Sequence, residues 1–148
     1  MSDTTRMAPP TGGLGPESVT KADYVRLARF RSALRQFMRF SELRARAAGL
    51  TPQQHQMMLA IKGRPDRDWA TVGELAEVLQ VNHNAAVGLV RRAEEAGLVT
   101  RTPHPADRRS VCVGLTPKGE AMLAALSAEH KQELDRLIPA FADLLELD

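Results

Sequence analysis

Apolar residues between positions 71 and 97 recur with the period of an α-helix in two short segments. The first segment presents an apolar face formed by Leu75, Ala76 and Leu79. The second presents one stripe whose members are spaced i, i+3, i+4 and i+7, namely Ala86, Leu89, Val90 and Ala93. The pattern predicts two short helices that each bury one face.

Residues that favour helix ends stand at the ends of both segments. Thr71 suits the start of the first helix, and Glu74 stands three residues later, where its side chain reaches back to the N–H of the cap. Gln80-Val81 is the expected turn, and the side-chain oxygen of Asn82 suits the start of the second helix. Gly97 ends that helix where a left-handed backbone is favoured. Together the segments predict a helix-turn-helix.

The second helix carries small or basic residues, and no acid, on the face opposite its stripe: His83, Asn84, Val87, Gly88 and Arg91. The amide of Asn84 suits adenine N6 and N7 in a major groove. His83 shares this face, which favours a DNA contact over a solvated first-turn histidine, and Arg91 is placed to reach a phosphate or a guanine. Ordinary packing of two short helices explains the same pattern, so the residues that follow decide.

The end of the second helix is charged with both signs. Arg92 is expected to pair with an acid such as Asp107 or Glu95. Glu94 and Glu95 would be repelled by phosphate, so the C-terminal half of this helix is expected to leave the groove.

Two short strands are predicted after the helix-turn-helix, over 98–101 and 110–115. The turn-rich sequence TPHPADRR between them ends in Arg108 and Arg109. A hairpin with a basic tip directly after a helix-turn-helix is typical of a winged helix, although a solvated loop tip is the usual role of such an arginine pair. Trp69-Ala70 is placed to add a third strand to this sheet.

A long helix is predicted on each side of the winged helix. The helix over 20–48 has a narrow apolar seam of Leu27, Phe30, Leu34 and Phe37, and the helix over 117–147 carries Leu134, Ile138, Phe141 and Leu145. Pro139 is expected to kink or break the second helix. Residues 21–46 hold eight Lys/Arg against two acids, whereas 117–148 hold three against seven. These opposite charges and seams predict that the helices pair, partly across the subunits of a homodimer.

Three stretches resemble the MarR family (multiple-antibiotic-resistance-type regulators): LTPQQHQMMLAI, VGELAEVLQVNHNAAVGLVRRAEEAGLVTR and DRRSVCVGLTPKG. The specific marks are Gly97-Leu98-Val99 with Arg101, then Asp107-Arg108-Arg109, then the exit at 115–119. The resemblance implies a mainly α fold with a small antiparallel β-hairpin, a winged helix-turn-helix flanked by N- and C-terminal dimerisation helices. It implies a dimeric transcription factor, often a repressor released by a small ligand or by oxidation.

The resemblance also implies roles for the wing. Arg109 would enter the minor groove beside Arg108, steadied by Asp107 two residues earlier. The chain departs from the family at two positions. Gly88 stands where a longer polar residue is common, which implies fewer base contacts, and Ala93 stands where Leu is common, which implies a lighter core.

Ligands in the resembled family often lie between the dimerisation helices and the winged helix. Here Phe37, Met57, Met58 and Trp69 are placed to line such a space, and core packing explains them equally well. Some relatives sense oxidants through a cysteine of the N-terminal helix, where this chain has none. Cys112, on the second wing strand, is therefore expected to be structural rather than a redox switch.

The composition fits one globular domain over 20–148, with its winged helix over about 50–116 and a disordered tail over 1–19 that is rich in Pro, Gly, Ser and Thr. A net charge of +2 permits nucleic-acid binding without requiring it. One cysteine and the lack of a long apolar run predict a cytoplasmic protein with no membrane span. The four histidines lack metal-ligand spacing and no catalytic motif occurs, so no metal, cofactor or enzyme activity is expected.

The predicted function is sequence-specific binding of double-stranded DNA as a transcriptional regulator, a homodimeric repressor at an inverted repeat, with a small-molecule effector as a further partner. The alternative is a winged helix that serves as a protein-interaction module and docks an acidic partner on its basic face. Binding to random duplex DNA separates the two, because a DNA-binding protein loses affinity steeply as salt rises.

Overall fold

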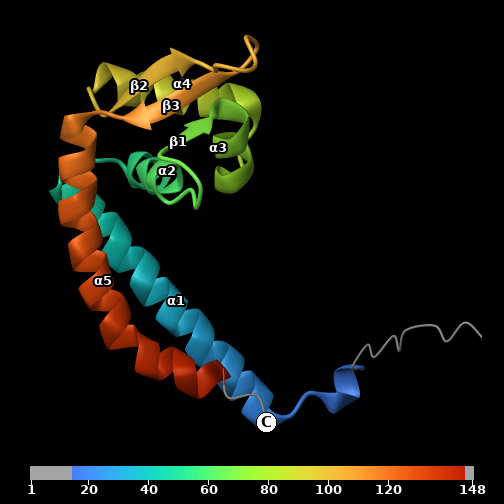
Figure 1. Cartoon of the computed structure of the whole chain (residues 1–148). Helices are drawn as coiled ribbons and strands as arrows, with labels where there is room; N and C mark the ends of the chain where they lie inside the picture. The colour runs from blue at the N-terminus through green and yellow to red at the C-terminus, as the bar shows by residue number, and fades with distance from the viewer. Residues whose placement is uncertain (1–14, 146–148) are drawn as a thin grey trace, which may run out of the picture.

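The computed structural model describes the backbone of residues 15–145, with the side chains of that range except 17 and 143–145. Two long helices extend from a compact unit of three short helices and a small sheet (Figure 1). The elements in chain order are η1 (Pro16–Ser18), α1 (Lys21–Ala47), α2 (Pro52–Lys62), β1 (Trp69–Thr71), α3 (Val72–Leu79), α4 (His83–Glu95), β2 (Val99–Pro103), β3 (Val111–Leu115) and α5 (Pro117–Leu145). The predicted winged-helix fold is confirmed, and residues 1–14 of the predicted disordered tail lie outside the described range.

The helix ends form at the residues that the sequence marks. In α3, Thr71 Oγ1 accepts the N–H of Glu74 at 3.1 Å, and Glu74 Oε1 accepts the N–H of Thr71 at 3.0 Å. The predicted turn follows, with Gln80 in the left-handed region at φ 56°. Asn82 Oδ1 then accepts the N–H of Ala85 at 2.8 Å and starts α4, which Gly97 follows at φ 74°. These local bonds satisfy N–H groups that helix ends leave without partners.

The wing is an antiparallel sheet in the order β1-β3-β2. Trp69 and Thr100 both lie opposite Gly114, from the two sides of β3. The third strand expected at Trp69-Ala70 is therefore present as β1. Strand β1 leads directly into α3 and pairs with β3, so it connects the helix-turn-helix to the wing sheet.

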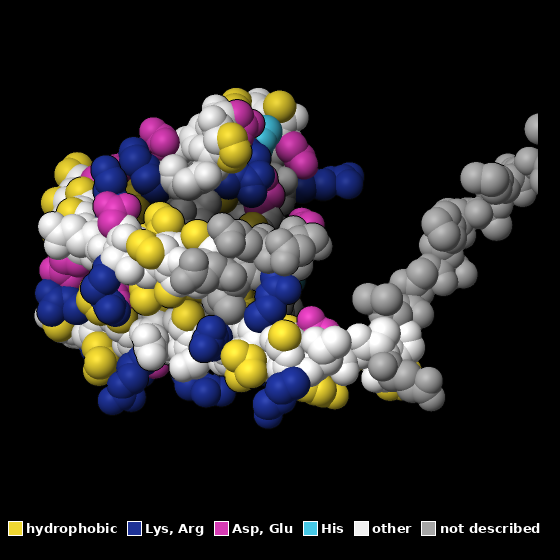
Figure 2. Space-filling model, turned by 90° about the horizontal axis from the view of Figure 1, so that it is seen from below, with side chains coloured by type: hydrophobic (Ala, Val, Ile, Leu, Met, Phe, Trp, Pro, Cys, Tyr) yellow, Lys and Arg dark blue, Asp and Glu magenta, His cyan; other side chains and the backbone are white. Residues whose placement is uncertain are grey.

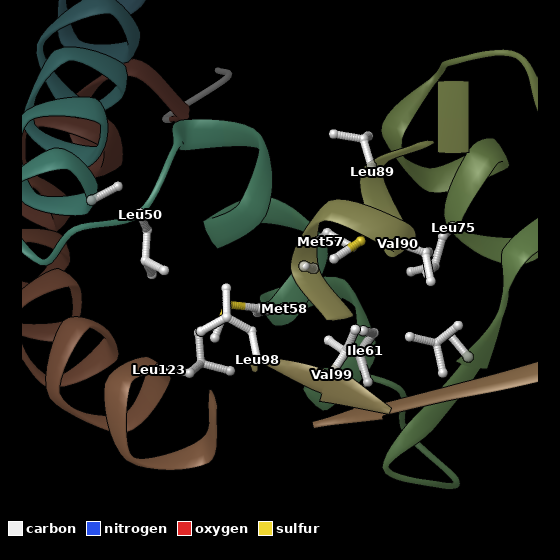
Figure 3. Packing of buried hydrophobic residues seen from close by; sticks show 14 of the residues in the cluster. Leu50, Met57, Met58, Ile61, Leu75, Leu89, Val90, Leu98, Val99 and Leu123 are labelled. Carbon is white, nitrogen blue, oxygen red and sulfur yellow. The ribbon is translucent and has the colours of Figure 1, made fainter. Parts of the chain in front are cut away.

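The core lies inside the winged helix, where α2, α4 and the sheet meet (Figure 3). All four apolar-stripe residues of α4 are buried, as the helical period predicts. Ala93 is fully buried against the same cluster, so its small side chain sits in packed surroundings. Met57, Met58 and Ile61 give α2 its buried face and reach the same core.

The start of α5 docks tightly on the junction between α4 and β2. Thr116 donates its N–H to Leu98 O at 3.0 Å and its hydroxyl to Gly97 O at 2.6 Å. Its Oγ1 also accepts the N–H of Gly119 at 3.0 Å, which caps α5. The segment 115–119, which connects β3 to α5, thus has a structural role, because it fixes the direction in which α5 leaves the wing.

The long helices α1 and α5, called the arms below, lie against each other away from the core (Figure 1). Phe30 and Phe141 meet edge to face with ring centroids 5.9 Å apart. Of the kink or break predicted at Pro139, the break does not occur, because α5 continues to Leu145; Figure 1 shows the helix bending in its C-terminal part. The ring contact holds the turn after the proline against α1, which offsets the backbone bond that a proline removes.

Much of the apolar seam remains exposed within one chain. Leu27 is 64% exposed and Ile138 54%, and Phe30, Leu34 and Leu134 are each above 40%. Phe37 is half-buried, and the side chain of Leu145 lies outside the described residues. The face seen from below shows hydrophobic side chains interspersed with Lys and Arg (Figure 2).

Two buried histidines meet where the arms join the winged helix. His55 of α2 and His130 of α5 have ring centroids 4.8 Å apart and are 4% and 9% exposed. His130 bonds through Nδ1 to Leu126 O and through Nε2 to the Ser41 hydroxyl, at 2.7 and 2.9 Å. Nδ1 of His55 has no hydrogen-bond partner among the described residues. Burial, and then the neighbouring His130, lowers the pKa of His55 below its ordinary value of 6.5.

We expect the free energy of unfolding to fall as the pH drops below about 6.5. His55 stays neutral in the folded chain, whereas the unfolded chain takes up a proton near the ordinary pKa, so acid favours unfolding. The slope from one such group is at most about 1.4 kcal/mol per pH unit. Urea denaturation between pH 5.5 and 7.5 measures it, and His55→Leu should flatten the profile. An equal slope in the parent and in His55→Leu would exclude His55 as the cause.

Candidate nucleic-acid interface

The outward face of α4 carries the residues predicted to read bases. His83, Asn84 and Arg91 are exposed, Val87 is 40% exposed, and Gly88 is half-buried. The buried stripe holds the opposite side of the helix in the core, which fixes the rotation of α4 about its axis. The structure thus presents all five on one outward-facing surface.

The guanidinium of Arg92 lies over Gly88. A Cβ placed there would lie 3.6 Å from Nη1 of Arg92. The side chain of Arg92 folds back over the preceding turn, as i and i+4 neighbours on a helix do. The predicted pairing of Arg92 with Asp107 or Glu95 is absent from the ion pairs between described residues. Arg92 therefore places its charge on the outward face of α4, beside the space that the glycine leaves open.

Asp107 organises the wing turn through the main chain. Its Oδ1 accepts the N–H of Arg109 at 2.9 Å, and its Oδ2 accepts the hydroxyl of Ser110 at 3.2 Å. The side chains of Arg108 and Arg109 are exposed. The acid that the resemblance assigns to steadying the wing arginine acts here on the backbone of Arg109, which leaves the guanidinium of Arg109 for another partner.

A hollow of about 300 Å³ lies between the start of α3, the outward face of α4 and the wing. It brings together three of the predicted contact residues, His83, Val87 and Arg109. The complete lining is Thr71, Val72, Gly73, His83, Val87, Val90, Arg101, Arg109, Ser110 and Val111. This described lining contains no acid, and two arginines and a histidine give it a positive character.

The other predicted contact residues lie around this hollow. Asn84, Gly88 and Arg91 are on α4 outside its lining, and Arg108 lines a neighbouring surface hollow with Glu94 and Thr102. The interface is therefore a surface that runs from α4 to the wing tip, with the hollow between them.

Arg101, named above only as a mark of the family resemblance, is a further functional candidate. Its Nε and Nη2 each donate to the carboxylate of Glu94 at 3.0 Å. This hydrogen bonding lowers the pKa of Glu94, so the acid stays ionised and paired. The pair joins the end of α4 to β2 and offsets a negative charge that would repel phosphate. Helical periodicity gives no signal for it, because the two residues lie in different elements.

The four residues named for a ligand space lie in different surroundings. Met57 and Met58 are fully buried in the core, Phe37 contacts His130, and Trp69 contacts the wing. Core packing accounts for both methionines. Cys112 is 5% exposed on β3, so its thiol is shielded from solvent.

The described residues contain no group of three or more metal-ligating side chains placed to hold an ion. None of the described helices has the length and hydropathy that a membrane span requires.

The winged-helix segment and much of the chain are similar in sequence to known transcriptional regulators. The family model described as "MarR family" matches residues 48–110, the segment that holds α2, the helix-turn-helix and the wing. A curated protein of Thauera aromatica, described as a putative transcriptional regulatory protein for the hcr operon, is 30% identical over 71% of this chain and 62% of its own length. The chain spans about half the length of the curated relatives it matches.

Solved structures share the whole architecture. AbsC of Streptomyces coelicolor, a MarR family transcriptional regulator, superposes with a TM-score of 0.67 at 21% identity, over 86% of this chain and 83% of AbsC. A mutant of S. aureus MepR bound to an oligodeoxyribonucleotide superposes with a TM-score of 0.61 at 18% identity, over 88% and 86% of the two chains. At these identities the likeness shows the fold, arms included.

Proposed function

We propose that this chain, whose residues 48–110 match the MarR family model, is a MarR-type homodimeric repressor that binds double-stranded DNA in a sequence-specific manner. The observation that carries the proposal is the surface that runs from the outward face of α4, through a hollow whose lining contains no acid, to the exposed arginines of the wing. A DNA duplex presents phosphates on both sides of each groove, so a helix and a basic wing side by side fit adjacent grooves.

In this proposal α4 lies in the major groove. Asn84 reads an adenine, and Val87 offers an apolar surface to a thymine methyl group. His83 and Arg91 contact bases or phosphates beside them, and the charge of Arg92 lies over Gly88 on the same face. Arg109, with Arg108, enters the neighbouring minor groove, where a narrow A·T-rich segment concentrates negative potential.

The exposed apolar seams of α1 and α5 support a homodimer. Leu27, Phe30, Leu34, Leu134 and Ile138 would leave five large apolar side chains exposed to water if the chain were a monomer. A two-fold axis uses each seam twice and gives two recognition helices on one side of the duplex. The operator then contains an inverted repeat with half-sites about 10 base pairs apart.

Release by a small molecule is the part of the proposal that the family resemblance supplies. A hollow of about 240 Å³ between the end of α1 and the first half of α5 offers space for such an effector. It is lined by Arg44, Met122 and Glu129 among others, and it adjoins the joint between the arms and the winged helix.

Asn84→Ala and Arg109→Ala should weaken DNA binding in different ways. Asn84→Ala is expected to cost about 1–3 kcal/mol on the preferred site and to relax the preference at one base pair. Arg109→Ala is expected to weaken binding to all sequences and to lower the slope of log K against log salt by about one. Fluorescence anisotropy with labelled duplexes at several salt concentrations measures both effects.

Arg39→Ala is the matched control, because it removes the same charge from the exposed side of α1. It should leave affinity and slope unchanged. Parent-like binding by both Asn84→Ala and Arg109→Ala would show that α4 and the wing are not the DNA-binding surface. Salt-insensitive binding by the parent would favour the protein-interaction alternative.

A further inference from the structure

His104, at the start of the wing loop, joins the wing tip to the rest of the winged helix. Its Nδ1 accepts two backbone N–H groups, from Ala106 at 3.0 Å and from Asp107 at 3.1 Å. An imidazole nitrogen that accepts hydrogen bonds carries no proton, so Nδ1 of His104 acts here purely as an acceptor. The ring thus closes the turn from which Asp107 holds the backbone of Arg109.

The other side of the ring is anchored to β1. His104 and Trp69 meet nearly perpendicular, at 81°, with ring centroids 5.2 Å apart. The guanidinium of Arg67 lies in turn over the ring of Trp69, 4.1 Å from its centroid. Both contacts are of the kind in which an aromatic ring orients its neighbour.

The stack ends at the helix-turn-helix. Arg67 and Arg64 both bond to Oε2 of Glu74, whose Oε1 caps the first turn of α3. The side chains of Arg67 and Glu74 are 20% and 24% exposed, so the ion pair is mostly shielded from water. A continuous series of contacts therefore runs from the start of α3 to the wing turn that presents Arg109.

We propose that His104 is a positioning residue for DNA binding, which holds the wing turn in the conformation that directs Arg109 toward the duplex. The inference rests on the proposed function of the wing. An unanchored wing would have to be ordered when DNA binds, and the conformational entropy lost in that step would weaken the complex. Residue 104 itself makes no contact with DNA in this proposal.

The role depends on one atom, which gives a sharp pair of variants. In His104→Asn, the side-chain oxygen occupies the place of Nδ1 and accepts the same two N–H groups. In His104→Gln, the amide is displaced by one carbon and corresponds to Nε2 instead, so the turn loses its acceptor. Both variants remove the imidazole and keep a neutral polar side chain at a half-buried position, so they differ chiefly in this acceptor.

We expect His104→Gln to bind the preferred duplex about tenfold more weakly, the scale of a lost intramolecular hydrogen bond. Its salt slope should equal that of the parent, because Arg109 still reaches the DNA in the complex. His104→Asn should bind within about twofold of the parent. In the free proteins, amide hydrogen exchange at Ala106 and Asp107 should be accelerated in His104→Gln and parent-like in His104→Asn.

Equal affinity of the parent and His104→Gln for the preferred duplex would overturn the proposal. A salt slope lowered by about one in His104→Gln would also overturn it, since His104 would then be a phosphate contact. An equal loss of duplex affinity in His104→Gln and His104→Asn would overturn the role given to Nδ1, because the loss would then come from removal of the ring. Failure of the proposed function looks different: the parent itself would bind no duplex, while the exchange difference at Ala106 and Asp107 would still report on the turn.

Discussion

Leu34→Glu is expected to give a monomer that no longer binds its operator. Leu34 lies on the seam of α1 and is 42% exposed in one chain, so a partner subunit is needed to bury it. In a two-fold dimer the variant introduces two carboxylates into an apolar contact, and each unpaired buried charge costs several kcal/mol. The dimer dissociation constant should therefore rise by a factor on the order of a thousand or more.

Sedimentation at micromolar concentration measures this change, together with anisotropy on a duplex with both half-sites. Gln36→Glu is the matched control, since it introduces the same residue on the same helix, away from the seam. It should stay dimeric and bind DNA. A Leu34→Glu protein that remains dimeric and binds like the parent would show that α1 does not contribute its seam to the subunit contact.

Gly119→Ala is expected to destabilise the fold strongly for a steric reason. A Cβ at Gly119 would lie 2.2 Å from the carbonyl oxygen of Leu98 and 3.1 Å from its carbon. These are backbone atoms at the docked junction between α5 and β2, so relief requires the two elements to separate. Overpacking at such a site costs about 1–3 kcal/mol or somewhat more. Because alanine favours helix, the cost is entirely one of space.

Urea or thermal unfolding of the two glycine variants tests this account. Gly73→Ala is the control: it lies exposed in α3, and its Cβ would meet only Thr71 Oγ1 at 3.9 Å. Alanine there should leave stability unchanged or raise it by up to about 1 kcal/mol. Equal stability of the parent and Gly119→Ala would mean that α5 is not held against Leu98 as closely as the structure has it.

Local chemistry made much of the winged helix predictable. The capping pair Thr71 and Glu74, the cap at Asn82 and the left-handed Gly97 each depend on residues a few positions apart, so their spacing is visible in the sequence. The buried stripe of α4 is predictable from the helical period, and the outward face consists of the residues that the same period places opposite the stripe. The strand at Trp69 was predictable only because a winged-helix sheet has a place for it.

Contacts between distant residues were not predictable in this way. The pairing of Arg101 with Glu94, the ring contact of His104 with Trp69 and the buried pair of His55 and His130 join separate elements, and no periodic pattern marks them. Arg92 was misassigned because the space left by Gly88 draws its side chain back over the helix. The break, one of the two alternatives predicted at Pro139, does not form, because tertiary packing of Phe141 on Phe30 outweighs a local helix penalty.

The sequences of DNA duplexes that the purified protein selects from a random pool test the central claim most directly. The account predicts enrichment of an inverted repeat whose half-sites lie about 10 base pairs apart, with an A·T-rich segment where each wing meets the minor groove. Arg109→Ala should lose the A·T preference and keep the half-site sequence. Recovery of no sequence preference, or of a single unrepeated site, would contradict a dimer that reads DNA with α4 and the wing.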